Sequence, residues 1–238
     1  MYNPRNGGDA RFGSRYQYQT LPYQFVGTQS SGLMSKVMGL LAFSFIFASV
    51  GSFFGITVGL GYGASLVAAI AGLVVLIALN FLIQRPGINL FLLYLFTFLE
   101  GLSLAPLLGY YLYASGSILL QAFLMTALTS LGLGIYAWTT KRDFSRLGDY
   151  LFFGLLLLIV AGLIQIFFHS PIFALIVALV GVAIFSGYML YYIQRAKYMA
   201  DTMPNAIGLT VSIFITVLNL FLYILELLSI LSGNSNRR

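Results

Sequence analysis

The chain has 238 residues, 60% of them hydrophobic and only 8% charged, with a mean hydropathy of +0.94. A soluble domain carries about 25% charged residues, so this composition excludes a soluble fold and predicts a polytopic α-helical membrane protein. The net charge of +6 is a topology signal carried by loops and tails, so we expect a lipid bilayer and no nucleic acid as partner.

The chain begins with a polar, basic segment, residues 1–34, which we expect to be a flexible cytoplasmic tail. Residues 35–238 are predicted to form one all-α domain with seven transmembrane helices joined by short connections. The predicted spans are Val37–Val58, Ala64–Ile83, Ile88–Gly109, Ser117–Trp138, Asp149–Phe168, Pro171–Tyr192 and Ala206–Leu231.

Lysines and arginines occur in every second connection between the predicted spans, and this pattern predicts the orientation of the chain in the membrane. Besides the three arginines early in the tail, one side receives seven of these residues, and the other receives none before Arg237 and Arg238 at the terminus. The N-terminus is therefore expected in the cytoplasm and, if the last segment spans fully, the C-terminus outside. If that segment re-entered instead, both ends would lie inside. The seven residues are Lys36, Arg85, Lys141, Arg142, Arg146, Arg195 and Lys197.

Two spans carry a small residue at every fourth position. These residues are Gly51, Gly55 and Gly59 in the first span, and Gly101, Ala105 and Gly109 in the third. Small residues at this spacing let two helix backbones approach closely, so we expect tight packing between helices here.

The last span is the only one with an orderly line of polar groups along its length. At 3.6 residues per turn its polar side chains project from one narrow stripe of the helix. One side of this helix therefore faces other helices, water or an ion path instead of lipid. We predict that the remaining helices surround it. The residues of this polar stripe are Ser212, Thr216, Asn219, Tyr223 and Glu226.

Two carboxylates lie inside predicted spans. Glu100 is about 18 Å into the third span, and we expect it to face the bundle interior near Thr97, Thr216 or Asn219. It is either a proton or cation site or a protonated member of a structural hydrogen-bond network. Glu226 lies near the outer interface, where it is either a snorkelling residue or part of a negative pore mouth.

Nothing in the sequence indicates an enzyme. The lone His169 has no second histidine or cysteine to form a transition-metal site with it. All four aspartates lie in the tail, in loops or at span ends, and no nucleophile–base pair is present. We therefore expect no catalytic residues, no resident metal and no cofactor.

Three stretches carry a resemblance to a known family. The third span (Leu93–Tyr111), the loop Tyr136–Gly154 and the run beginning at Asn219 resemble the Bax-inhibitor family in order and spacing. In the third span the matching residues are Thr97, Gly101, Leu102, Ser103 and Pro106. The resemblance covers nearly everything from about residue 35 onward, and it implies a fold of six helices around a central seventh.

The chain departs from this family at two positions. Members with calcium-leak behaviour carry two aspartates near the cytoplasmic end of the pore, and here Tyr192 and Thr216 stand in their places. Two carboxylates that share a proton form a pH-sensitive latch, which neutral side chains cannot reproduce. A bacterial subset of the family also lacks these aspartates. A member similar to this chain in that respect is linked to restraining a membrane-embedded ATP-dependent protease.

The resemblance and the polar stripe lead to two expectations about function. The first is a passive cation leak, for calcium or protons, along Thr216–Glu226, with Glu100 as the titrating group. The alternative is a non-conducting regulator that binds a membrane protease or another membrane protein. For either, we expect an integral protein of a bacterial cytoplasmic (inner) membrane.

Overall fold

The computed structural model describes residues 26–167 and 170–235, and every regular element in these ranges is an α-helix. Each of the six helices contains a stretch long and apolar enough to cross a membrane. Most of the predicted tail, His169 and the terminal arginine pair lie outside the described residues. The helices are α1 (Val26–Val58), α2 (Tyr62–Leu82), α3 (Ile88–Thr139), α4 (Leu147–Phe167), α5 (Pro171–Ala196) and α6 (Met203–Ser235).

The all-helical prediction is confirmed for the described residues, but the predicted count of seven separate helices is not. The third and fourth predicted spans both lie within α3, which has 52 residues. The connection Tyr110–Gly116 was predicted as a loop, and it remains helical except at Ser115 (φ −159°, ψ 55°). One residue outside helical geometry is enough to turn the chain, so no separate loop is needed.

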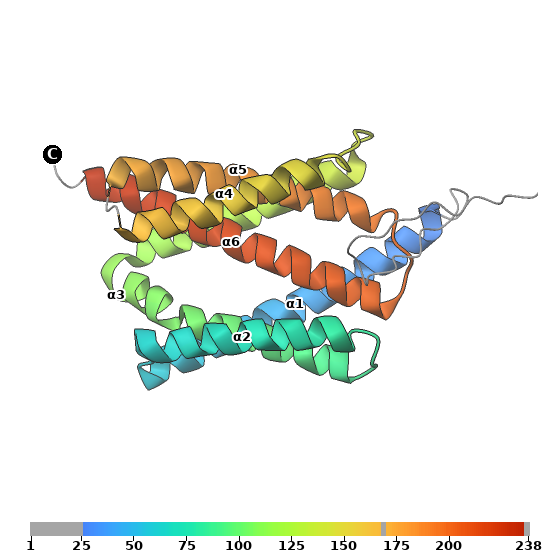
Figure 1. Cartoon of the computed structure of the whole chain (residues 1–238), viewed down its shortest axis with the longest axis horizontal. Helices are drawn as coiled ribbons and strands as arrows, with labels where there is room; N and C mark the ends of the chain where they lie inside the picture. Colours follow the sequence, from blue (N-terminus) through green and yellow to red (C-terminus); the bar gives the residue numbers. More distant parts are fainter. Residues whose placement is uncertain (1–25, 168–169, 236–238) are drawn as a thin grey trace, which may run out of the picture.

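Helix α3 therefore consists of two arms, residues 88–114 and 116–139. A straight helix of this length would measure about 78 Å, more than twice the 30 Å of a bilayer's hydrocarbon core. Figure 1 shows α3 reaching one end of the bundle beside α2, turning there, and running back beside α5. The second arm can thus pack against elements that the first arm does not reach.

The connections rich in lysine and arginine gather at one end of the molecule. The start of α1, the α2–α3 turn, the α3–α4 loop and the α5–α6 connection all lie at the right of Figure 1. We call this the basic end. Helix α6 ends at Ser235 at the opposite end, so it runs the whole length of the bundle as one helix.

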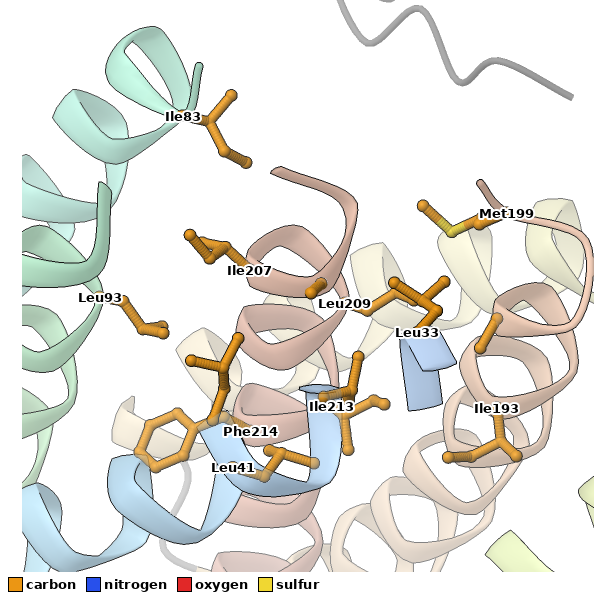
Figure 2. Packing of buried hydrophobic residues seen from close by; sticks show 14 of the residues in the cluster. Leu33, Leu41, Ile83, Leu93, Ile193, Met199, Ile207, Leu209, Ile213 and Phe214 are labelled. Carbon is orange, nitrogen blue, oxygen red and sulfur yellow. The ribbon is translucent and has the colours of Figure 1, made fainter. Parts of the chain in front are cut away.

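The core near the basic end is built around α6. Figure 2 shows Ile207, Ile213 and Phe214 of α6 pointing toward α1, α2 and α3, with Leu33 and Ile193 among their neighbours. Leu33 is completely buried and α1 begins at Val26, so the helix starts inside the segment that was expected to be a tail. Helix α6 packs against α1, α3 and α5, whereas α2 lies outside on α3.

The predicted close packing of small residues occurs between α1 and the first arm of α3. A Cβ atom on Gly51 would collide with the Phe98 backbone oxygen, and one on Gly101 would collide with the Ala48 backbone. A Cβ atom on Gly55 would lie 2.4 Å from the Ala105 side chain. Gly59 has a different role, because its φ of +69° ends α1 in a left-handed conformation that favours glycine.

Candidate functional site

The first three residues of the polar stripe each donate one side-chain hydrogen bond within α6. The Ser212 hydroxyl donates to Gly208 O (3.0 Å), the Thr216 hydroxyl to Ser212 O (2.7 Å), and the Asn219 amide to Ile215 O (2.8 Å). None of the three side chains accepts a hydrogen bond from another described residue. The stripe therefore carries a series of oxygen atoms with unused acceptor capacity.

Tyr223 and Tyr192, which are 31 positions apart in the sequence, are joined by a row of aromatic rings. Tyr223 stacks on Phe185 (5.7 Å between ring centroids), Phe185 contacts Tyr188 (6.0 Å), and Tyr188 stacks on Tyr192 (5.6 Å). Gly181 makes room for this row, because a Cβ there would lie 2.5 Å from the Tyr223 ring. The aromatic row of α5 thus lies along one side of α6.

Glu226 is not a free charge at the end of the stripe. Its carboxylate accepts a hydrogen bond from Gln165 Nε2 of α4 at 2.7 Å. Gln165 was missed by the sequence analysis, although a single amide near the end of an otherwise apolar helix is a recognisable signal. The pair connects α4 to α6 at the end of the bundle opposite the basic end.

Glu100 lies away from the stripe. Its carboxylate is half-buried against α2, and a Cβ on Gly72 would sit 3.3 Å from Oε1. Thr97 is completely buried and donates to Tyr94 O within its own helix. The Glu100 carboxylate has no hydrogen bond or ion pair with any described residue. The structure therefore does not bring Glu100 together with Thr97, Thr216 or Asn219, and Gly72 is the neighbour that the sequence analysis missed.

The basic loop, residues 140–146, is fastened to α5 by Gln194. The Gln194 amide donates to Arg142 O, and its Oε1 accepts from the Phe144 N–H at 2.5 Å. Gln194 is buried, and nothing in its sequence context indicated this role. The loop is therefore attached to α5 while its three cations, Lys141, Arg142 and Arg146, stay exposed.

An aspartate stabilises the end of this loop. Asp143 accepts hydrogen bonds from the backbone N–H (2.8 Å) and hydroxyl (3.0 Å) of Ser145. These bonds lower the pKa of Asp143, and the nearby Arg146 adds to the effect. The loop thus keeps a negative charge between its cations at neutral pH.

The described residues contain no group of three or more histidine, cysteine, aspartate or glutamate side chains that could hold a metal ion.

Comparisons with known proteins show the family of this chain. A family model described as inhibitor of apoptosis-promoting Bax1 matches residues 30–234. An uncharacterized membrane protein of Vibrio cholerae is 31% identical over 212 residues, which are 87% of this chain and 92% of the relative. Mouse protein lifeguard 4 is 33% identical over 162 residues, 68% of this chain and 66% of the relative. A Golgi anti-apoptotic protein of vaccinia virus is 31% identical over 147 residues, 62% of this chain and 60% of the relative. The resemblance is thereby confirmed, and the chain belongs to the Bax inhibitor family.

Proposed function

We propose that the chain is a passive cation pathway, for calcium or protons, that crosses the membrane seven times with α6 at its centre. The two arms of α3 would each cross once, since each is long enough to span the hydrocarbon core. The basic end would face the cytoplasm, and the C-terminus would lie outside. The bacterial relatives favour a cytoplasmic membrane as the location.

The observation that supports a cation pathway is the direction of hydrogen bonding in the polar stripe. Ser212 and Thr216 donate their hydroxyl hydrogens to their own helix, and Asn219 donates one of its two amide hydrogens, so the groups left to meet a passing species are mainly oxygen acceptors. Hard cations such as calcium prefer oxygen ligands. An anion would find only two donors along the same face, the second N–H of the Asn219 amide and the Tyr223 hydroxyl.

The arrangement also supports a closed pathway in this conformation. The Gln165–Glu226 hydrogen bond occupies the acid at one end of the stripe, and the aromatic row from Tyr223 to Tyr192 lies alongside it. Opening would require these contacts to separate. Glu100, set apart between α2 and α3, would influence such a movement as a titrating group without lining the stripe.

Removing the acceptor oxygens is expected to abolish the leak. Thr216→Val combined with Asn219→Leu keeps the side-chain volumes similar but leaves the stripe without its two central oxygens. Calcium and proton flux into dye-loaded liposomes containing the purified protein should fall to the level of empty liposomes.

The control is Thr126→Val, which removes a hydroxyl that is also buried and bonded within its own helix (Thr126 to Ala122 O, 2.7 Å) but lies outside the stripe. It should leave the flux unchanged. If the unmodified protein conducts no better than empty liposomes, the pathway proposal is wrong.

The basic loop favours a second candidate, a regulator of a membrane-embedded ATP-dependent protease. Gln194 holds Lys141, Arg142 and Arg146 in fixed, exposed positions, which suits docking to an acidic surface. Reversing the charge of Lys141 and Arg142 should then remove the protease from the purified complex. Charge reversal of Arg85, which is also at the basic end, should not. Equal losses from both changes, or no co-purification at all, would rule this candidate out.

A further inference from the structure

A groove of about 760 Å³ runs along the bundle between α1 and the second arm of α3. Its floor is formed by α5 and α6 and includes Met189, Ile213 and Phe221, all of them buried. The surface of its walls is almost entirely apolar. Small residues such as Ala42 and Ala127 leave open space between the two walls. The groove does not include the polar stripe, so it is separate from the proposed cation pathway.

The groove opens at the side of the molecule. Ile135 on its wall is 65% exposed, and Met38, Phe123 and Leu131 on the same walls are exposed as well. In contrast, Ile213 on the floor is 1% exposed. Because these helices are apolar over the length of a membrane span, the opening faces the hydrocarbon of the bilayer.

The length of the groove suits an acyl chain that lies along the bundle. On α1 the groove extends from Met34 to Ser52, which is about 27 Å at 1.5 Å per residue. This is close to the hydrocarbon thickness of a bilayer, about 30 Å, so an extended acyl chain can lie in the groove over its whole length.

One end of the groove carries a positive charge. Trp138 and Thr139 line the groove at the basic end, and Lys197 Nζ lies 5.7 Å above the Trp138 ring. The ammonium also lies 3.5 Å from Thr140 O, and it has no ion pair with any described residue. Burial lowers the pKa of Lys197, so an anionic neighbour would stabilise its charged form.

We propose that this groove binds an anionic phospholipid, with one acyl chain lying between α1 and α3 and its phosphate beside Lys197. The second acyl chain stays in the surrounding bilayer. The bound lipid would fill the space between α1 and the second arm of α3, and its headgroup would sit next to the basic loop. The lipid would therefore act as a structural ligand of this part of the bundle.

Quenching of tryptophan fluorescence by brominated lipid tests this proposal, because Trp138 is the only tryptophan in the chain. The full-length protein is placed in two sets of nanodiscs with the same ratio of phosphatidylglycerol to phosphatidylcholine. In one set the acyl chains of phosphatidylglycerol carry bromine, and in the other those of phosphatidylcholine. At equal bromine content we expect at least twofold stronger quenching by the anionic lipid.

Two pairs of variants distinguish quenching by a lipid bound in the groove from quenching by lipids that surround the protein. Lys197→Gln should equalise the two lipids, whereas Arg85→Gln, the same charge change elsewhere at the basic end, should preserve the preference. Ala127→Phe fills the groove from an exposed wall position and should also equalise them. Leu128→Phe, at the adjacent exposed position outside the groove, should not. Ala42→Phe on the opposite wall repeats the groove-filling test if Ala127→Phe lowers the melting temperature.

Equal quenching by both lipids in the unmodified protein would overturn the proposal. So would equal effects of Lys197→Gln and Arg85→Gln, because the preference would then come from surface charge alone. Quenching that decreases as more protein is placed in each disc would indicate a second copy of the chain in the groove, which also contradicts a lipid occupant.

Discussion

Replacing Gly101 by alanine is expected to lower the free energy of unfolding by about 3 kcal/mol, the upper part of the range for overpacking. The added Cβ would overlap the backbone of Ala48 in α1, where no side chain can rotate away. Either α1 and α3 must separate, which also breaks the Gly51–Phe98 and Gly55–Ala105 contacts, or the backbone must distort. Unfolding of the purified protein in mixed micelles with increasing dodecyl sulfate, followed by circular dichroism, measures the loss.

Gly109→Ala is the matched control, since it makes the same change on the same arm of α3. A Cβ at Gly109 would lie 3.6 Å from the Ile56 side chain, which is ordinary contact. Alanine is also favoured over glycine within a helix by about 0.5–1 kcal/mol, so this variant should be as stable as the unmodified protein or slightly more stable. Similar losses in the two variants would show that the α1–α3 interface is not closely packed at Gly101.

Replacing Gln194 by leucine is expected to release the basic loop. The variant loses both hydrogen bonds to the loop and leaves the Arg142 carbonyl and the Phe144 N–H without partners. Two such losses cost about 2 kcal/mol, which corresponds to a roughly thirty-fold larger population of the open loop. Trypsin should therefore cleave after Lys141 and Arg142 about thirty times faster, as measured by gel analysis of the cleavage time course.

The comparison variant is Asn80→Leu, which also replaces an amide by leucine. Asn80 donates only to Leu76 O within α2, so its removal leaves the loop attached. Its cleavage rate should match that of the unmodified protein. If Gln194→Leu is cleaved no faster than Asn80→Leu, Gln194 does not hold the loop.

The features that could be predicted from the sequence are those governed by local periodicity and composition. The all-helical membrane fold follows from the apolar runs. The polar stripe follows from the 3.6-residue repeat, and its five residues all lie in α6. The small-residue spacing identified Gly51, Gly55, Gly101 and Ala105 as packing positions, and the structure pairs them. Each of these patterns is complete within one segment of the chain.

The partners of the intramembrane acids could not be predicted in this way. Glu226 meets Gln165 from 61 residues earlier in the chain. Glu100 turns toward Gly72 of α2 and away from the stripe. Periodicity shows which residues share a helix face, but the neighbour of that face depends on how the helices pack. The same limit explains α3, where hydropathy indicated two spans but could not reveal that only Ser115 leaves helical geometry between them.

The sequence by itself determined that this chain is a helical membrane protein of the Bax inhibitor family, with its cations in alternate connections and a polar stripe on its last helix. The tertiary structure alone decided that Ser212, Thr216 and Asn219 each donate a hydrogen bond within α6, that Gln194 holds the basic loop, and that α1 and α3 enclose a lateral groove. The physical reason is the range of the interactions. Hydrophobic periodicity acts within a few turns of one helix, whereas hydrogen bonds and cavities between helices depend on residues that are brought together only when the whole bundle has packed.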